Sequence, residues 1–265
     1  MSANYVMTTM ITQIPDTLSI MGVNVTPFDS YSHAVECVSD RIEKRQKTAV
    51  IAVNPEKIYR AYYDENLKKM INDADIKICD GIGVVYAAKL LLGKNLKRCT
   101  GIQLFLNLVQ KASQKEFKVY LLGASDESNW LASSNLFKMY PSLKIVGRHG
   151  GYFKDSQEII KQINESQAEM LFVAMGSPKQ EFWIAEHRET ISVLFCMGVG
   201  GTFDVISGCV KWAPKIFRKT GTEFLHRLIT NPKRLRRQLV LPKFVLMVLK
   251  EKFFGTLLKN KTKAE

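Results

Sequence analysis

The sequence predicts an α/β fold with a mostly parallel sheet that helices cover on both faces. Between residues 18 and 197, short apolar runs typical of buried strands alternate with longer segments whose apolar positions recur at helical spacing. This alternation favours right-handed strand–helix–strand crossovers. After Gly208 it stops and the chain becomes basic. We therefore expect a Rossmann-like domain at residues 18–210, a loose leader at 1–17, and a basic, partly amphipathic helical appendage at 211–265.

The individual elements follow from the apolar runs and from the turns between them. We expect strands at residues 18–25, 48–53, 76–79, 117–123, 143–146, 170–175 and 193–197. We expect helices at residues 31–45, 55–74, 82–91, 100–114, 126–140, 155–166, 179–188 and 222–230, and a further helix that begins at residues 231–232. Because proline is favourable at the first position of a helix, Asn54 before Pro55 is expected to cap the second helix.

Asp80 occupies the place where a sheet of this kind binds its ligands. Open parallel sheets bind ligands outside the carboxyl ends of their strands, and Asp80 directly follows the strand at residues 76–79 and precedes Gly81 and a helix. A carboxylate there can act as a general base, hold a sugar or ribose hydroxyl, or cap the helix. The residues around Asp80 leave these three roles open.

Nearly all of the excess positive charge lies in the C-terminal fifth of the chain. The formal net charge is +13. Residues 211–265 hold 15 Lys and Arg against 3 Asp and Glu, whereas residues 1–210 hold 23 against 22. This asymmetry indicates an acidic partner for the appendage: nucleic acid, phosphate groups or an anionic membrane.

The appendage combines arginines with an amphipathic basic segment. Arg227, Arg234 and Arg237 are spaced by seven and then three residues, and arginine forms bidentate bonds to phosphate oxygens. Beyond them, residues 239–258 interleave apolar side chains with lysines, which suits an anionic membrane surface. The alternative is an ordinary helix that docks on the core.

Other features argue against metal ions and the common cofactors. The five cysteines and four histidines are scattered without metal-ligand spacing. Glycine-rich turns follow several strands, but none has the dinucleotide fingerprint or the Walker A pattern. We expect no signal peptide, because residues 1–16 are polar, and no membrane span, because the sequence has no apolar run long enough. We expect no metal, no cofactor and a location in the reducing cytoplasm.

Several ordered motifs resemble those of one enzyme family, the WecG/TagA/CpsF bacterial glycosyltransferases (glycosyltransferase family 26). The resemblance runs from about residue 18 to residue 241. Its motifs are Asn54-Pro55-Glu56, Asp80-Gly81-Ile82-Gly83, Arg98 with Thr100-Gly101, residues 176–181 (Gly-Ser-Pro-Lys-Gln-Glu), residues 198–204 (Gly-Val-Gly-Gly-Thr-Phe-Asp), Trp212-Ala213-Pro214, and residues 223–228 leading to Pro232-Lys233-Arg234. Each motif is weak alone, and their order makes them specific.

The resemblance implies an inverting, metal-independent hexosyltransferase. Such enzymes transfer a sugar, often of the N-acetylmannosamine type, from a UDP-sugar donor to a polyprenyl-diphosphate-linked amino sugar. They act as peripheral proteins on the inner face of the cell membrane, in the synthesis of O-antigen, teichoic acid or other surface polysaccharide. By resemblance, Asp80 is the general base, Arg98 and Gln180 are substrate-binding residues, and the appendage with Arg227, Arg234 and Arg237 closes over the active site and stabilises the UDP diphosphate.

The remaining candidate residues are expected to bind the substrates. We expect Asn54, Thr100 and Gln180 to contact the substrates, and Thr202 and Asp204 to hold the nucleotide. Where the family often has threonine two residues before the asparagine, this chain has Ala52, which suggests a different donor or acceptor sugar.

Two other classes of protein stay open at this stage, together with a possible homo-oligomer. One is a sugar-nucleotide-binding protein without turnover on the same fold, because a fold alone does not establish catalysis. The other is a nucleic-acid-binding protein, since the tail is basic. We expect no nucleic-acid partner, because no recognised motif or aromatic stacking platform is present.

Overall fold

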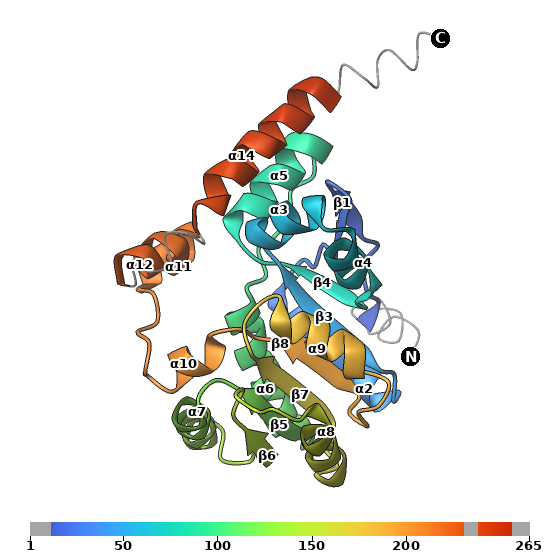
Figure 1. Ribbon diagram of the computed structural model, residues 1–265, viewed down its shortest axis with the longest axis vertical. Helices are drawn as coiled ribbons and strands as arrows, with labels where there is room; N and C mark the ends of the chain where they lie inside the picture. The colour runs from blue at the N-terminus through green and yellow to red at the C-terminus, as the bar shows by residue number, and fades with distance from the viewer. Residues whose placement is uncertain (1–11, 231–237, 256–265) are drawn as a thin grey trace, which may run out of the picture.

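A six-stranded, all-parallel sheet forms the centre of the molecule, which we describe from a computed structural model for residues 12–230 and 238–255 (Figure 1). The strand order is β4-β3-β8-β7-β5-β6. The strands are β3 (Thr48–Val53), β4 (Ile76–Cys79), β5 (Lys118–Gly123), β6 (Lys144–His149), β7 (Met170–Ala174) and β8 (Phe195–Gly198). The α/β fold with a parallel sheet is therefore confirmed.

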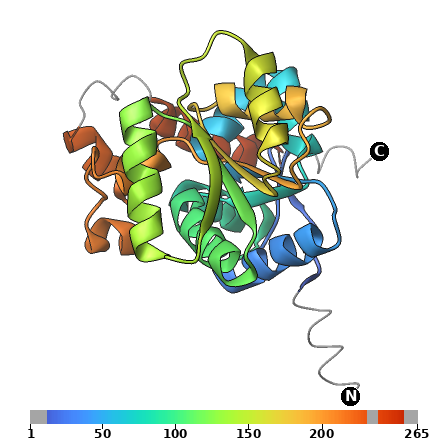
Figure 2. The same ribbon diagram turned by 90° about the horizontal axis from the view of Figure 1, so that it is seen from below.

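Helices cover both faces of the sheet, as Figure 2 shows. They are α2 (Tyr31–Glu43), α3 (Pro55–Tyr63), α4 (Glu65–Asp73), α5 (Ile82–Leu92), α6 (Gly101–Lys115), α7 (Asp126–Met139), α8 (Ser156–Glu165) and α9 (Lys179–His187). Helices α2, α6 and α7 share one hydrophobic cluster with the sheet. Helices α3, α4 and α5, and likewise α8 and α9, pack on the opposite face.

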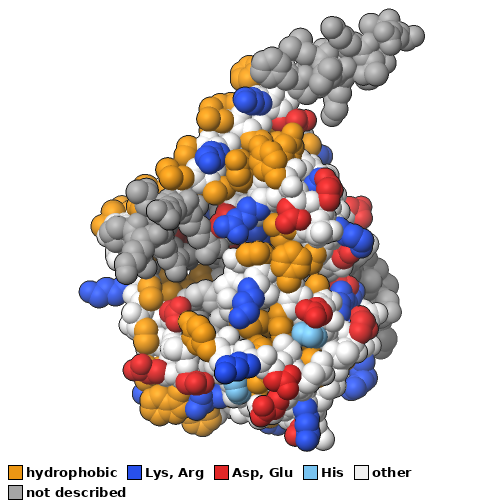
Figure 3. All heavy atoms as spheres, viewed as in Figure 1, with side chains coloured by type: hydrophobic (Ala, Val, Ile, Leu, Met, Phe, Trp, Pro, Cys, Tyr) orange, Lys and Arg blue, Asp and Glu red, His pale blue; other side chains and the backbone are white. Residues whose placement is uncertain are grey.

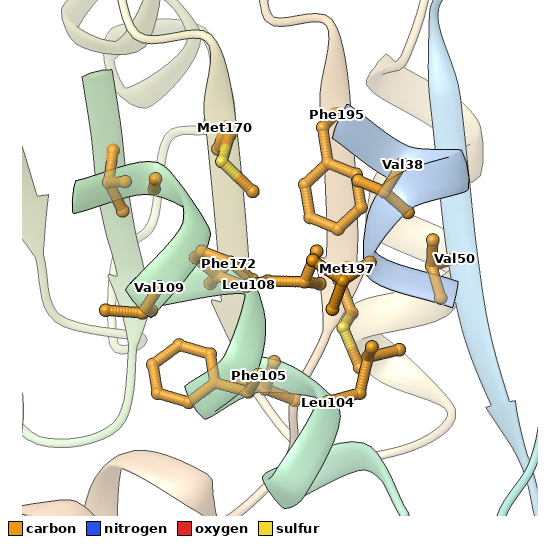
Figure 4. Packing of buried hydrophobic residues seen from close by; sticks show 14 of the residues in the cluster. Val38, Val50, Leu104, Phe105, Leu108, Val109, Met170, Phe172, Phe195 and Met197 are labelled. Atoms are coloured by element: carbon orange, nitrogen blue, oxygen red, sulfur yellow. The ribbon is translucent and has the colours of Figure 1, made fainter. Parts of the chain in front are cut away.

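Alternate residues of each strand supply the two cores. In β3, Val50 faces the α2 and α6 side, whereas Ile51 and Val53 face α3. Figure 4 shows the first core, in which Leu104 and Phe105 of α6 lie against the sheet. Because both faces are buried, the strands are continuous apolar runs, as expected for a parallel sheet.

The predicted strand at residues 18–25 is wrong in one respect, because it is a two-stranded hairpin. Strands β1 (Leu18–Ile20) and β2 (Val23–Val25) pair antiparallel. Met21 and Gly22 both have positive φ, at 53° and 81°. Positive φ at both central residues is the signature of a type I′ turn, which matches the twist of a hairpin. The apolar run hid this turn because methionine is not a typical turn residue.

Other differences concern strand bounds and helices. Strand β6 continues to His149 instead of ending at residue 146, and β8 covers Phe195–Gly198 instead of residues 193–197. The helix expected at residues 55–74 is two helices, because Asp64 adopts extended backbone and its side chain caps α4. Two short helices, α10 (Thr202–Ile206) and α11 (Lys215–Thr220), were not predicted. They are too short to show helical periodicity in the sequence.

The C-terminal appendage packs on helices α3 and α5. It contains α11, α12 (Glu223–Thr230), α14 (Val240–Lys250) and a π-helical turn η2 (Glu251–Gly255). Helix α14 buries Phe244, Met247 and Val248 in the cluster shared with α3 and α5. The helix start expected at residues 231–232 lies outside the described residues. Among the helices that the structure describes, none is long and apolar enough to cross a membrane.

Candidate active site

The chain changes direction between β3 and β8, and this topological switch point is where open α/β sheets bind ligands. From β3 the chain continues through α3 and α4 to β4, the edge strand next to β3. From β8 it continues in the opposite direction along the sheet, into α10, which packs against α7 near β5 and β6. The sequence motifs after β3, β4 and β8 therefore converge on one edge of the sheet.

Asp80 lies at this edge, directly before the N-cap residue of α5. Its backbone N–H donates to the Val53 carbonyl oxygen at 2.8 Å, which continues the β3–β4 pairing by one residue. The N-cap position of α5 is occupied by Gly81, at φ 102°, one residue after Asp80.

The Asp80 carboxylate faces the first turn of α6. A Cβ atom added at Gly101 would lie 3.9 Å from Asp80 Oδ2 and 3.5 Å from the Ala52 Cβ. Helix α6 has 15 residues, and the side chain of its N-cap residue, Thr100, does not cap it. The partial positive charge of this helix end favours an ionised carboxylate beside it.

Tyr31 is a residue of this region that the sequence reasoning missed. Its hydroxyl accepts a hydrogen bond from the Thr100 backbone N–H at 2.9 Å and makes a second one, at 3.0 Å, with Thr100 Oγ1. Burial raises the pKa of the Tyr31 phenol above its ordinary value, and the nearby Asp80 charge raises it further. Tyr31 thus stays protonated and holds Thr100, a predicted site residue, next to Asp80.

Asn54 caps α3 as predicted, and its motif packs against that of Asp80. The Asn54 Oδ1 accepts a hydrogen bond from the Lys57 backbone N–H at 2.9 Å. Pro55 lies so close to the first turn of α5 that a Cβ at Gly83 would be 2.7 Å from the Pro55 Cγ. The absence of a side chain at Gly83 therefore allows the N-termini of α3 and α5 to meet.

Gln180 is buried and its side-chain amide points into the protein. Its Oε1 accepts from the Gly200 backbone N–H at 2.9 Å, and its Nε2 donates to Glu181 Oε1 at 2.9 Å. A Cβ at Gly198 would be 2.5 Å from Gln180 Nε2, so this amide occupies the space beside the turn after β8. In this arrangement Gln180 shapes the turn, and both ends of its amide are used within the protein.

Thr202 and Asp204 also make contacts within the protein. The Thr202 hydroxyl donates to the Val199 carbonyl oxygen at 2.6 Å, and Thr202 is buried. Asp204 Oδ1 accepts from Ser128 Oγ of α7 at 2.7 Å. These two bonds shape the turn after β8 and hold α10 on α7.

Arg98 joins the α/β domain to the appendage. Its Nη1 donates to both carboxylate oxygens of Glu223 in α12, at 3.1 and 2.8 Å, and its Nη2 donates to the Arg218 carbonyl oxygen. A Cβ at Gly221, between α11 and α12, would be 2.8 Å from the Ile82 Cβ. Glu223 is a contact that the sequence did not predict.

The structure describes less of the three other predicted arginines. Arg227 lies in α12, and the structure describes its backbone only. Arg234 and Arg237 lie outside the described residues. Within residues 12–230 and 238–255, no group of three or more His, Cys, Asp or Glu side chains could hold a metal ion.

Comparison with known proteins matches the chain over both the sheet and the appendage. A family model described as the glycosyl transferase WecG/TagA/CpsF family matches residues 18–257. A relative from Bacillus spizizenii strain W23 is 38% identical over 210 residues, which are 79% of this chain and 81% of the relative. One from Bacillus subtilis strain 168 is 33% identical over 242 residues, 91% of this chain and 93% of the relative. Both are named N-acetylglucosaminyldiphosphoundecaprenol N-acetyl-beta-D-mannosaminyltransferase.

Proposed function

Since this chain is a glycosyltransferase that belongs to the WecG/TagA/CpsF family, we propose that it transfers N-acetylmannosamine from UDP to the N-acetylglucosamine of a polyprenyl-diphosphate-linked acceptor. The names of the two relatives support the sugar and the acceptor. The observation that carries the mechanism is Asp80, a carboxylate at the ligand-binding edge of the sheet that faces the first turn of α6.

In the proposed reaction Asp80 is the general base. An acceptor hydroxyl attacks the anomeric carbon of the donor while the bond to the UDP oxygen breaks on the opposite face, which inverts the configuration. Asp80 takes the proton of that hydroxyl, for which it must come within about 3 Å of the oxygen. The N-terminus of α6 and the Tyr31–Thr100 pair hold the surroundings of the carboxylate in place.

The diphosphate that leaves carries growing negative charge, which needs donors or cations. We propose that Arg227, Arg234 and Arg237 of the appendage supply them, without a metal ion. Arg98 contributes indirectly, because its bonds to Glu223 and to the Arg218 carbonyl hold the appendage on the domain. This role differs from the direct substrate contact that the family resemblance implies for Arg98.

The appendage and α5 offer a surface suited to an anionic membrane. Exposed apolar side chains gather on them, as Figure 3 shows in its upper part, among them Tyr86, Val245, Leu246 and Phe253. Lys243 and Lys250 are exposed on α14 beside them. A lipid-linked acceptor lies in a membrane, so we propose that this face rests on the inner face of the cell membrane.

The proposed function is tested by UDP release from a panel of UDP-sugars, with and without a short-chain polyprenyl-diphosphate-N-acetylglucosamine analogue. We expect release from UDP-N-acetylmannosamine that depends on the acceptor. Release from another donor only would refute the proposed sugar, and would be consistent with the alanine at position 52. Binding of UDP-sugars without release from any pair would favour a sugar-nucleotide-binding protein.

A further inference from the structure

A buried ion pair lies beneath the switch point of the sheet. Lys57 Nζ lies 2.7 Å from Glu181 Oε1, and the two side chains are 7% and 1% exposed. Lys57 comes from α3, which follows β3, and Glu181 comes from α9, which follows β7. The pair therefore joins two helices that begin at the ligand-binding edge, in two of the motifs noted in the sequence.

The ion pair is one part of a chain of hydrogen bonds between the ends of β3 and β8. Lys57 Nζ also donates to the Ala52 carbonyl oxygen of β3 at 2.7 Å. Glu181 Oε1 accepts from Gln180 Nε2, and Gln180 Oε1 accepts from the Gly200 N–H beyond β8. Five groups are thus linked in series across the two strands that flank the switch point.

The Glu181 carboxylate is held in its ionised state. Burial alone would raise the pKa of Glu181, but the Lys57 charge and the hydrogen bonds from Lys57 and Gln180 outweigh it and hold that pKa below its ordinary value. The ionised carboxylate fixes which way the Gln180 amide faces, because Oε1 of Glu181 accepts only from the NH₂ end. The other end of the amide then faces Gly200.

The need for two buried charges is not explained by stability. Replacing a buried ion pair by apolar side chains of similar size is often neutral or stabilising, because the charges lose their hydration. Gln180, Gly200 and the end of β3 all lie at the edge where the donor nucleotide is expected. A displacement of about 1 Å at such a place can reduce catalysis about 10²-fold.

We propose that Lys57 and Glu181 are positioning residues for the donor site, which orient Gln180 and through it fix the turn at residues 198–201 against the end of β3. This inference rests on the proposed use of a UDP-sugar donor. It assigns Gln180 a role through the turn, with its amide bonded inside the protein.

The test removes the pair without leaving a lone buried charge. In Lys57→Met/Glu181→Leu both charges are lost together, so the melting temperature should stay within a few degrees of the wild-type value. The dissociation constant for UDP, measured by calorimetry, should rise at least tenfold. The kcat/KM for the donor should fall about 100-fold, while the KM for the acceptor stays within twofold.

Two further variants separate positioning from a structural role. Gln180→Met leaves the ion pair intact and should raise the UDP dissociation constant to the same extent. Combining it with the double variant should add no further loss, because the three residues act as a unit. Lys57→Met/Glu181→Gln also leaves no lone buried charge but keeps an acceptor oxygen for Gln180, so it should recover most of the affinity lost in Lys57→Met/Glu181→Leu.

A matched control lies at the opposite end of the same sheet. Arg41 pairs with Asp75 at 3.2 Å, on the side of the strands' amino ends. Arg41→Met should lower the melting temperature and leave UDP affinity unchanged.

A folded Lys57→Met/Glu181→Leu protein with wild-type UDP affinity would overturn the proposal, and so would losses that add to those of Gln180→Met. Because UDP binding is measured without acceptor or turnover, an incorrect donor sugar would leave this test intact.

Discussion

Loss of the Arg98–Glu223 contact should open the appendage, and a double-mutant cycle can measure by how much. Arg98 donates two hydrogen bonds to the Glu223 carboxylate, and the side chains are 19% and 20% exposed. Hydrogen bonds to charged groups contribute about 1.5–3 kcal/mol when buried, whereas exposed ion pairs contribute about 0.2–1 kcal/mol. Because both side chains are about one-fifth exposed, we assign the pair about 1.5 kcal/mol, the low end of the range for hydrogen bonds to charged groups.

The expected result is a tenfold change in the opening of the appendage, because about 1.4 kcal/mol corresponds to a factor of ten. Hydrogen exchange at the amides of α11 and α12 reports that opening. Glu223→Ala should accelerate exchange about tenfold. Arg98→Ala should accelerate it more, since it also loses the bond to the Arg218 carbonyl oxygen. The double variant should exchange no faster than Arg98→Ala alone.

Activity distinguishes this role of Arg98 from direct substrate binding. If Arg98 acts by holding the appendage, Glu223→Ala must also reduce acceptor-dependent UDP release. Wild-type exchange and activity in Glu223→Ala, with activity lost in Arg98→Ala, would refute the reasoning. Lys44→Ala is the control, because it breaks an exposed pair with Asp40 on α2 and should change neither quantity.

Three further predictions concern packing and pH. Phe244→Ala should weaken the docking of α14 by about 3–5 kcal/mol, seen as faster tryptic cleavage within α14; an unchanged rate would contradict the packing. Gly123→Ala should cost about 3 kcal/mol or more and lower the melting temperature by at least 6 °C, because φ is 121° and the new Cβ would lie 2.4 Å from the Ala174 carbonyl oxygen. In Gly176→Ala the new Cβ would meet no atom within 4 Å, so only the positive φ should lower the free energy of unfolding, by about 1 kcal/mol. Equal losses of stability in Gly123→Ala and Gly176→Ala would refute the steric account. Burial raises the pKa of Cys196 to about 12, so its contribution to stability is complete below pH 9, where the unfolded thiol is still protonated, and falls by about 1.4 kcal/mol per pH unit between pH 9 and 12. The free energy of unfolding of Cys196→Ala should therefore decline less steeply over that range, and equal slopes would contradict this.

The sequence predicted the sheet and the position of Asp80 well, because both depend on local patterns. Buried parallel strands are continuous apolar runs, and their boundaries at residues 48–53 and 76–79 agree with the structure. The Asn54-Pro55 cap is also a local signal, and it was correctly predicted. Once these strands are parallel, Asp80 must lie at their carboxyl edge.

What the sequence did not predict depends on contacts between distant elements. Lys57 looks like an ordinary surface lysine of an amphipathic helix, and only the approach of α9 buries it against Glu181. Tyr31 reaches Thr100 across 69 residues of chain. Glu223 meets Arg98 across 125 residues. No spacing rule within a helix or strand reports such pairs.

The central claim is that Asp80 is the base of glycosyl transfer, and the kcat of Asp80→Asn tests it most directly. The measurement follows acceptor-dependent UDP release at saturating donor and acceptor, with UDP affinity and the melting temperature measured on the same protein. Asp155→Asn, which changes the capping carboxylate of α8, is the matched control. We predict a kcat reduced about 10²–10⁴-fold in Asp80→Asn, with UDP affinity within twofold of wild type and no loss in the control. A kcat within threefold of wild type in Asp80→Asn would contradict the assignment.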